Sequence, residues 1–339
     1  MNNQIAAVGF YQHLPISNPN SLQDITVTTP TMKAHDLLVQ VNAVSVNPVD
    51  TGVRGGGSAQ RLKHPKVLGW DAVGQVQAVG KEVTLFQPGD RVWYAGDFQR
   101  SGSNTQLQAV DERIVGTAPQ NLSDEQAAAV PLVGLTAYES LFEKFSLQKN
   151  DKILIINGSG GVGSMAIQLA KLAGLTVIAT ASKPQSVAWV QDLGADFIID
   201  HHQDLVSQMR ALGFRYVDKI LNLNNLDAHW SEIAELIKPD GQVVATTENH
   251  QLIDLQKLTK KRVTFSWEWM YSKSYYQLPS MMTQHDILSK LAKLYETKLL
   301  IPINKISYSP INATNLRQAH HDIESGRMVG KVILAGWKR

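Results

Sequence analysis

The sequence predicts an α/β fold in which a doubly wound parallel sheet is inserted between two parts of a mainly β domain. Three observations predict this arrangement. Short β segments separated by turns fill residues 1–122, strands alternate with helices over 123–264, and two helices with a closing strand fill 265–339. The last part is too short to form a domain alone, so we expect it to return to the first part. A chain of 339 residues is also long enough for two domains of roughly 150 residues each.

The first part contains short β-rich segments, which we expect to form strands: 36–46, 72–79, 90–95 and 112–115. Groups of residues that favour turns separate them, at 47–48, 55–57 and 88–90. The pattern changes at Ser123, which precedes a helix-forming run over 124–129. Gln126 stands three residues after Ser123, where a capping box requires glutamine or glutamate. We therefore expect a helix to begin there.

The central part alternates short apolar runs with helical stretches. The expected strands are 153–157, 176–181, 197–200, 219–223 and 242–246. Helices are expected over 162–173, ending at Gly174, and over 184–194. Strands that are apolar throughout are typical of a parallel sheet covered on both faces. This part is therefore predicted to be a nucleotide-binding domain. In the last part, we expect helices over 279–298 and 313–325 and a strand over 331–335.

Composition excludes several classes of function. The chain has no cysteine, which rules out disulfides, thiolate catalysis and thiolate metal ligands. Its 32 basic and 30 acidic side chains interleave without a long basic run, so we expect no nucleic-acid partner. The first residues lack a signal-peptide pattern, and no apolar run approaches the roughly 20 residues of a membrane span. We therefore expect a cytoplasmic protein without membrane contact.

The most informative segment joins an expected strand to an expected helix. Its glycines fit the pattern G-x-G-x-x-G in the run Gly158, Ser159, Gly160, Gly161, Val162 and Gly163. Glycine is required because the turn is tight, the backbone approaches a pyrophosphate and the helix packs closely on the strand. The free N–H groups at the start of the helix then bind the negative charge. The segment therefore predicts a bound dinucleotide.

The end of the second strand distinguishes the two nicotinamide cofactors. A site for NAD places an acidic residue about 20 residues beyond the glycines, where it binds the ribose 2′-hydroxyl. Residues 180–183 contain no acidic side chain. Ser182 can donate a hydrogen bond to a 2′-phosphate, and Lys183 supplies positive charge. We therefore predict NADPH; the alternative is that the two residues are simply exposed in a loop.

Six further segments occur in a characteristic order: 45–50 (SVNPVD), 69–71 (GWD), 88–92 (PGDRV), 135–139 (LTAYE), 193–196 (LGAD) and 330–332 (GKV). With the glycine motif, they resemble the medium-chain dehydrogenase/reductase superfamily over nearly the whole chain. The resemblance is strongest to its quinone oxidoreductase branch, particularly the bacterial zinc-type alcohol dehydrogenase-like proteins. It implies a Rossmann domain inserted into a GroES-like catalytic domain, and a homodimer.

The sequence differs from the zinc enzymes of this superfamily at their metal ligands. Those enzymes use a cysteine in the first loop, a Gly-His-Glu segment and a second cysteine. Here Asp50 stands in the loop, Trp70 replaces the histidine and Asp71 replaces the glutamate. Trp70 cannot ligate a metal. The histidine pairs at 201–202 and 320–321 are expected to be exposed residues at helix ends, so we expect no zinc.

The expected lack of zinc favours particular substrates. Alcohol oxidation would lack the metal that stabilises an alkoxide. A small planar quinone or enone needs less help because the incoming charge delocalises into a quinol or enolate. We therefore expect hydride transfer from NADPH to such a substrate, with a proton from water or a nearby hydroxyl. Reduction of small aldehydes or other carbonyls and a non-enzymatic NADPH-binding role are the alternatives.

The resemblance implies catalytic roles for the loop that contains Asn47, Asp50 and Arg54. Asn47 is expected near the nicotinamide or the substrate carbonyl, although the Asn-Pro sequence is also typical of a turn. Asp50 and Arg54 are expected to form an ion pair that holds the loop. The Tyr94 hydroxyl is a candidate to assist protonation, and a packing role for this ring is at least equally expected.

The remaining candidates belong to the cofactor site or the substrate pocket. Thr136 resembles a threonine beside the nicotinamide, the alternative being a helix position that faces solvent. Lys331 is expected to reach the cofactor from the last part of the chain. Trp267 and Trp269 lie in an aromatic run that, with Trp70, suits a flat wall for a planar substrate. A core or dimer contact explains that run equally well.

Overall fold

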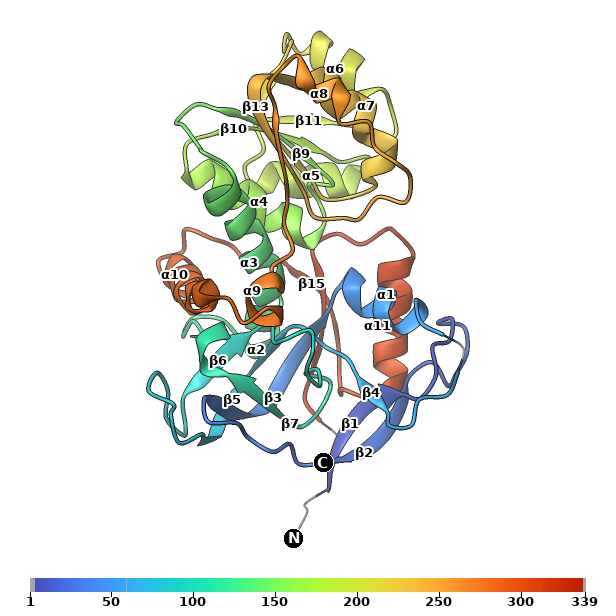
Figure 1. Cartoon of the computed structure of the whole chain (residues 1–339), viewed down its shortest axis with the longest axis vertical. Helices are drawn as coiled ribbons and strands as arrows, with labels where there is room; N and C mark the ends of the chain where they lie inside the picture. The colour runs from blue at the N-terminus through green and yellow to red at the C-terminus, as the bar shows by residue number, and fades with distance from the viewer. Residues whose placement is uncertain (1–3, 59, 338–339) are drawn as a thin grey trace. The chain divides into compact units, whose positions relative to one another are not determined.

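The computed structural model describes residues 4–58 and 60–337, and the chain divides into two compact units (Figure 1). The first unit contains the chain up to Leu132 and again from Tyr271 onwards, and the second contains Val133–Met270. The last part of the chain therefore returns to the first part, and the second unit is inserted between them. The sequence had predicted boundaries at 122/123 and 264/265, earlier than those of the two compact units.

Two elements account for the later boundaries. Helix α2 (Asp124–Ala128) packs against strands β3 (Asp36–Val46) and β16 (Lys331–Ala335) of the first unit. Its capping box is the one predicted, with Ser123 Oγ 3.2 Å from the backbone nitrogen of Gln126. At the other boundary, β14 (Thr264–Trp267) is a further parallel strand of the second unit, and it pairs with β13 (Ile237–Ala245).

Within the described residues, the strands of the first unit form two sheets. The larger sheet has the order β15-β16-β3-β5-β6-β8, with β7 also paired to β3. Because β16 runs antiparallel to β3, the end of the chain completes the sheet that its beginning started. The smaller sheet has the order β2-β1-β4. The strands not yet located are β1 (Gln4–Phe10), β2 (Gln23–Thr28), β4 (Lys66–Val67), β5 (Ala72–Val79), β6 (Arg91–Tyr94), β7 (Leu107–Asp111), β8 (Val115–Thr117) and β15 (Asn304–Tyr308).

Helical segments connect these strands. The strand predicted at 112–115 is instead a 3₁₀ turn, η1 (Glu112–Ile114), which leads into β8. The Asp111 carboxylate accepts a hydrogen bond from the backbone nitrogen of Arg113 at 3.0 Å and thereby caps this turn. The helix predicted over 279–298 begins as a 3₁₀ segment. The remaining elements are α1 (Pro48–Gly55), α9 (Ser272–Tyr275), η3 (Pro279–Met282), α10 (Thr283–Glu296) and α11 (Ala313–Glu324).

The second unit is built on a parallel sheet with the order β11-β10-β9-β12-β13-β14. Strands β9 (Lys152–Ile156) and β10 (Thr176–Thr180) are buried along almost their whole length, which agrees with coverage of both faces. The strand order reverses between β9 and β12, and ligands of such sheets bind beyond the carboxyl ends of the strands at this reversal. The other elements are α3 (Pro131–Glu139, shared with the first unit), the π-helical η2 (Ser140–Lys144), α4 (Gly161–Leu172), α5 (Pro184–Asp192), β11 (Phe197–Ile199), α6 (Leu205–Ala211), β12 (Val217–Asn222), α7 (Leu226–Leu236) and α8 (Gln256–Thr259).

The apolar core of the second unit holds these strands in register. Leu154, Ile178 and Ile220 from three neighbouring strands pack with Met209 of α6 and Trp230 of α7. Full burial of each such side chain contributes about 1.5–3 kcal/mol. The carboxyl ends of β9, β10 and β12 are therefore held on a rigid support. Among the described residues, none of the helices has both the length and the apolar character needed to cross a membrane.

Candidate functional site

The glycine motif forms the turn between β9 and α4. Asn157 starts the turn with a positive φ of 67°, and the backbone nitrogen of Gly158 donates to Thr180 O at 3.0 Å. A Cβ on Gly158 would lie 2.9 Å from the Cβ of Ala179, and one on Gly163 would lie 2.4 Å from the carbonyl oxygen of Asn157. Close packing of the helix on the strands therefore requires glycine at both positions, which is one of the reasons that the sequence predicted.

The first turn of α4 offers a binding site for an anion. The backbone nitrogen of Ser164 is bonded to Gly160 O at 2.8 Å, one turn back along the chain. The preceding N–H groups, those of residues 161–163, have no acceptor within the helix and carry its partial positive charge. They lie at the end of β9, next to the reversal of strand order. This arrangement is suited to the pyrophosphate of a dinucleotide.

Ser182 and Lys183 follow β10, the neighbour of β9. Ser182 is half-buried and Lys183 is exposed at the N-terminus of α5. The Thr180 hydroxyl accepts a hydrogen bond from the backbone nitrogen of Asn157 at 2.8 Å, which joins the end of β10 to the glycine turn. The two predicted cofactor residues thus follow the strand adjacent to the turn, and a phosphate on the ribose would meet no carboxylate within 180–183.

The second group of predicted residues surrounds a buried carboxylate in the first unit. Asp71 is completely buried. Its Oδ2 accepts hydrogen bonds from Ser45 Oγ at 2.6 Å and from Asn47 Nδ2 at 2.7 Å, and its Oδ1 accepts one from the backbone nitrogen of Leu132 at 2.7 Å. Asn47 is also the N-cap residue of α1, which agrees with the turn interpretation. The Asn47 side chain is therefore held by Asp71.

Lys331 supplies the positive charge of this cluster; that it reaches the cofactor stays a prediction. Its Nζ donates to Asp71 Oδ2 at 3.2 Å, to Val46 O at 3.1 Å and to Asn47 Oδ1. These three acceptors use all three of its N–H donors. Burial lowers the pKa of Lys331, and the neighbouring Asp71 carboxylate opposes this shift. Strand β16 places this side chain inside the first unit as a counter-ion.

Asp50 and Arg54 do not form the predicted ion pair. Asp50 lies in the first turn of α1, and its Oδ2 accepts a hydrogen bond from the backbone nitrogen of Asn47 at 2.8 Å. Burial raises the pKa of Asp50 to about 7, although this hydrogen bond and the charge of Lys331 oppose the shift. Arg54, one turn later, instead contacts Glu324 of α11. Because the Asp50 carboxylate accepts a hydrogen bond at the start of α1, the Arg54 guanidinium pairs with Glu324 instead.

The Arg54 side chain also corrects the expectation for one histidine pair. Its Nε lies 3.4 Å from Nδ1 of His320, which is completely buried in α11 rather than exposed at a helix end. Burial and the charge of Arg54 lower the pKa of His320 to about 3. This histidine is therefore neutral near pH 7 and packs α11 against α1.

Trp70 lies beside the Asp71 cluster within an aromatic group that the sequence did not predict in full. Its side chain is 2% exposed and stacks on Phe98, with ring centroids 5.2 Å apart. Tyr271 meets Trp70 edge-on at 6.1 Å and lies 5.3 Å from Phe98. Burial, with the charges of Asp50 and Asp71, raises the pKa of Tyr271. Phe98 is in a turn-rich segment without periodicity, so no local pattern marked it.

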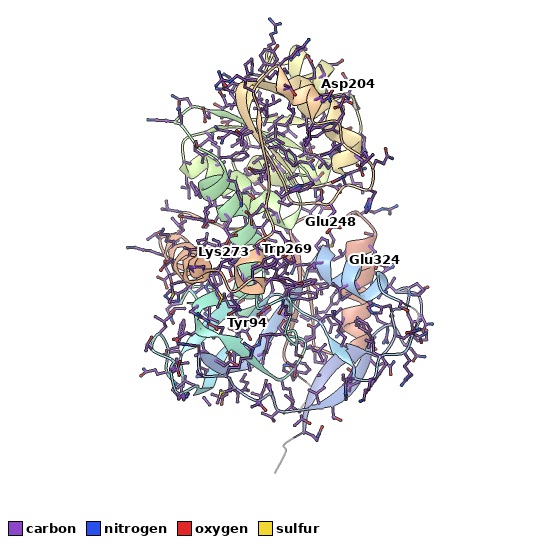
Figure 2. The ribbon with its side chains drawn as sticks, in the orientation of Figure 1. Tyr94, Asp204, Glu248, Trp269, Lys273 and Glu324 are labelled. Carbon is purple, nitrogen blue, oxygen red and sulfur yellow. The ribbon has the colours of Figure 1, made fainter. Side chains whose placement is uncertain are left out.

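The sequence predicted roles for three other aromatic residues, Tyr94, Trp267 and Trp269. Tyr94, on β6, is completely buried among the strands of the first unit (Figure 2), and burial raises its pKa. This favours the packing interpretation over a role in protonation. Trp267 and Trp269, of which Figure 2 labels the second, belong to the second unit and are 45% and 38% exposed. Their part in a substrate wall with Trp70 stays a prediction. Thr136, on α3, is buried, so the solvent-facing alternative is wrong.

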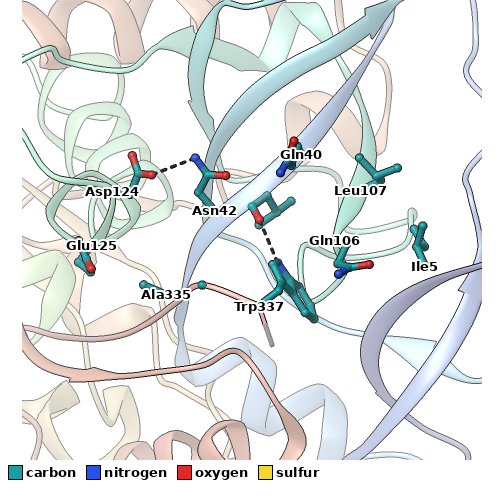
Figure 3. A pocket seen from close by; sticks show the side chains of 11 residues that line it. Ile5, Gln40, Asn42, Gln106, Leu107, Asp124, Glu125, Ala335 and Trp337 are labelled. Atoms are coloured by element: carbon teal, nitrogen blue, oxygen red, sulfur yellow. Dashed lines mark hydrogen bonds between the residues drawn. The ribbon is translucent and has the colours of Figure 1, made fainter. Parts of the chain in front are cut away.

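A cavity of about 730 Å³ lies elsewhere in the first unit (Figure 3). It forms where β7 and β16 separate along the same edge of β3. The Trp337 indole donates to Val41 O at 2.9 Å across this separation. Its lining includes none of the predicted site residues, so it is not the candidate site. The lining residues are Ile5, Gln40, Val41, Asn42, Gln106, Leu107, Asp124, Glu125, Ala335, Gly336 and Trp337.

Comparison with known proteins identifies the family. Residues 33–132 match the model of the alcohol dehydrogenase GroES-like domain, and residues 161–284 match that of the zinc-binding dehydrogenases. A zinc-type alcohol dehydrogenase-like protein of Staphylococcus aureus is 39% identical over 333 residues, covering 96% of this chain and 98% of that protein. The chain belongs to the medium-chain dehydrogenase/reductase superfamily. It is an oxidoreductase with a Rossmann unit and a GroES-like unit.

Solved structures of this superfamily share the fold along the whole chain. A putative zinc-dependent alcohol dehydrogenase of Rhizobium etli is 40% identical, with a TM-score of 0.95 and 100% of both chains covered. A quinone oxidoreductase of Pseudomonas syringae is 25% identical, with a TM-score of 0.83, covering 98% of this chain and 99% of that one.

The names of these superfamily members raise the question of a zinc ion, and the residues of this chain do not fit one. Trp70 has no atom that binds a metal. Asp71 is already neutralised by the Lys331 ammonium at 3.2 Å. Over residues 4–58 and 60–337, there is no group of three or more His, Asp or Glu side chains arranged to hold a metal ion. Zinc chemistry therefore has no ligand set at Trp70 and Asp71.

Proposed function

We propose that this oxidoreductase uses NADPH to transfer a hydride to a quinone or an α,β-unsaturated carbonyl without zinc. The observation that carries the proposal is the glycine turn at the reversal of strand order, with Ser182 and Lys183 at the end of the next strand. The N–H groups of residues 161–163 would bind the pyrophosphate. Ser182 and Lys183 would bind the 2′-phosphate that distinguishes NADPH from NADH.

The proposed substrate class follows from the side chains that the first unit would place around a substrate. When bound, NADPH supplies a hydride. The first unit supplies a buried cluster whose carboxylate is neutralised by Lys331, and an aromatic group beside it at Trp70, Phe98 and Tyr271. Aromatic rings favour flat, conjugated molecules, and conjugation spreads the charge that arrives with the hydride. Similarity to the quinone oxidoreductase of Pseudomonas syringae supports the same substrate class.

The proposal is tested by following the absorbance of NADPH and NADH in parallel with benzoquinones, naphthoquinones, enones and small aldehydes, with and without a chelator. We expect turnover of quinones or enones, a preference for NADPH and no effect of chelation. Loss of activity with the chelator and its return with zinc would overturn the metal-free mechanism. Turnover of aldehydes alone would favour the carbonyl reductase alternative. Tight NADPH binding without turnover of any acceptor would favour a non-enzymatic role.

The oligomeric state is a separate proposal. We propose a homodimer, and analytical ultracentrifugation measures it. Strand β14 is the last strand of its sheet, and Trp267 on it is 45% exposed, so a further chain has an edge on which to pair. A species with the mass of a single 37.4 kDa chain at micromolar concentration would contradict this proposal.

A further inference from the structure

Reduction without a metal still requires a group that stabilises the negative charge on the substrate oxygen. The inference that follows rests on the proposed function. When a hydride adds to a conjugated carbonyl, negative charge develops on the carbonyl oxygen, and a fixed hydrogen-bond donor near that oxygen lowers the barrier. The donors of Lys331 are used by Asp71, Asn47 and Val46, and the Ser45 hydroxyl donates to Asp71. Neither Lys331 nor Ser45 therefore supplies the donor.

The indole of Trp70 carries a donor beside this cluster. Trp70 is buried, and its Nε1 has no hydrogen-bond acceptor among the described residues. Burial of an N–H group without an acceptor costs free energy that a bound ligand oxygen would recover. Indole nitrogen is a donor only, so the group that it lacks must be an acceptor such as a carbonyl or an oxyanion.

The position of this donor is fixed by its neighbours. One face of the indole stacks on Phe98 with an interplanar angle of 17°, and the edge of Tyr271 contacts it at 69°. The next residue in the chain, Asp71, is anchored by Ser45, Asn47 and Lys331. A donor held by packing on its ring and by hydrogen bonds on the adjacent residue needs little reorganisation when charge develops.

A second buried tryptophan shows that an unpaired indole alone is not a site. Trp93, on β6, also lacks an acceptor for its Nε1 among the described residues, and it is completely buried. Its ring contact is with Tyr295, at 6.3 Å, and β6 carries none of the cluster residues. Of the two, Trp70 is the one next in sequence to the buried carboxylate and packed against aromatic rings suited to a flat substrate. Trp93 is therefore the matched control.

We infer that the Nε1–H of Trp70 is the hydrogen-bond donor for the substrate oxygen that becomes negative during hydride transfer. In an enone, the hydride forms a C–H bond at the β-carbon, the C=C π bond breaks, and its electron pair moves through the conjugated system to the carbonyl oxygen. NADPH is oxidised to NADP⁺, and the enone is reduced. Trp70 stabilises the enolate oxygen without giving up its proton, and water supplies the proton that completes the product.

The first experiment compares Trp70→Phe with Trp93→Phe, because each change removes an indole N–H and retains an aromatic ring. With a quinone or enone as acceptor, we expect kcat of Trp70→Phe to fall by about 100-fold, as for other single oxyanion donors. The KM for NADPH should stay within about threefold of the wild-type value, because the cofactor site is in the other unit. Trp93→Phe should retain wild-type kcat. Equal effects of the two substitutions on kcat would overturn the inference.

The second experiment does not depend on turnover. The enzyme with NADP⁺ is titrated with 4-nitrophenolate, which mimics the enolate oxygen, and with 4-nitroanisole, which has no anionic oxygen. We expect Trp70→Phe to weaken phenolate binding about tenfold and to leave anisole binding unchanged, whereas Trp93→Phe changes neither. Equal phenolate affinities for wild type and Trp70→Phe would overturn the inference even if quinones are turned over. If the wild type reduces no acceptor, the proposed function fails, and this titration still decides the role of Trp70.

A third measurement uses wild-type Trp70, so it does not depend on whether a Trp70 variant folds. Wild-type protein labelled with ¹⁵N at its seven indole nitrogens is observed by NMR as 4-nitrophenolate is added. We expect one indole N–H signal to move downfield on binding, and the same signal to persist in Trp93→Phe. No downfield shift of any indole signal at saturating phenolate would contradict a hydrogen bond from Trp70.

Discussion

The glycine turn of the second unit and the Asp71 cluster of the first unit are held in place by different means. The turn is formed by the backbone of consecutive residues, 157–164. Its free N–H groups all belong to the N-terminus of one helix, α4. The cluster is made of side chains from distant segments, since Lys331 is 260 residues from Asp71. The turn therefore depends on local conformation, whereas the cluster depends on the packing of the whole first unit. Substitutions should affect the two regions differently.

The largest effect is expected where a partner is removed from the buried cluster. Asp71→Ala leaves the Lys331 ammonium buried without its counter-ion, and such breaks cost about 3–5 kcal/mol. Urea denaturation measures the free energy of unfolding. The double variant Asp71→Ala, Lys331→Met should be more stable than the single variant Asp71→Ala, because the unpaired charge is gone. A double variant as unstable as the sum of both single changes would show that the pair is not coupled.

The next effect is a dependence of stability on pH that comes from Asp50, at the start of α1. The pKa of Asp50 is raised from 3.8 to about 7, so the folded state binds its proton more tightly than the unfolded state does. The contribution of this proton to the free energy of unfolding is therefore fully present below pH 3.8 and is lost as the pH rises through about 7. Within this range, a rise of one pH unit lowers the free energy of unfolding by about 1.4 kcal/mol.

Urea denaturation at several pH values measures this dependence. We expect the wild type to lose stability more steeply than Asp50→Asn between about pH 5 and about pH 7, because asparagine does not titrate. Parallel curves for the two proteins would contradict a buried, protonated Asp50.

A smaller effect is expected from one methyl group in the turn. Gly163→Ala places a Cβ 2.4 Å from the carbonyl oxygen of Asn157, which forces the helix away from the strand and costs about 1–3 kcal/mol. It should also weaken NADPH binding, measured by fluorescence titration. Gly52→Ala in α1 is the control because nothing lies within 4 Å of its added Cβ. A Gly163→Ala protein as stable as Gly52→Ala would show that the turn tolerates a side chain.

The smallest effect is expected for cofactor choice at the end of β10. Lys183→Glu replaces the positive charge proposed to bind the 2′-phosphate, so the KM for NADPH should rise about tenfold, which corresponds to about 1.4 kcal/mol. The KM for NADH should change little. Lys260→Glu makes the same change of charge at another exposed lysine of this unit and should leave both values unchanged. Equal changes for the two cofactors in Lys183→Glu would contradict the proposed role of this lysine.

The same comparison explains how much the sequence could predict. The glycine turn requires particular residue types at fixed, short spacing, and so does the capping box at Ser123 and Gln126. Such local requirements can be recognised in a single sequence. The return of the last strand, Lys331–Ala335, was also predicted correctly, because its apolar run is short and the segment before it cannot form a core alone.

The contacts that were predicted wrongly depend on partners far away in the chain. Arg54 is four residues from Asp50, so a local ion pair was the natural expectation, yet its partner Glu324 lies on a helix at the other end of the sequence. The ion pair of Lys331 with Asp71 was likewise not predicted, because the two residues are far apart in the sequence. Side-chain partners across a sheet are set by the packing of whole elements, which no local spacing encodes.

The order in which the units are completed follows from the return of β16 to β3. During synthesis, the second unit is continuous from Val133 to Met270 and can fold while the remaining residues are still being added. The first unit has to wait for β16, which delivers Lys331 to a carboxylate made more than two hundred residues earlier. A chain that ends before β16 therefore contains the whole second unit, whereas its first sheet is incomplete and Asp71 lacks its counter-ion.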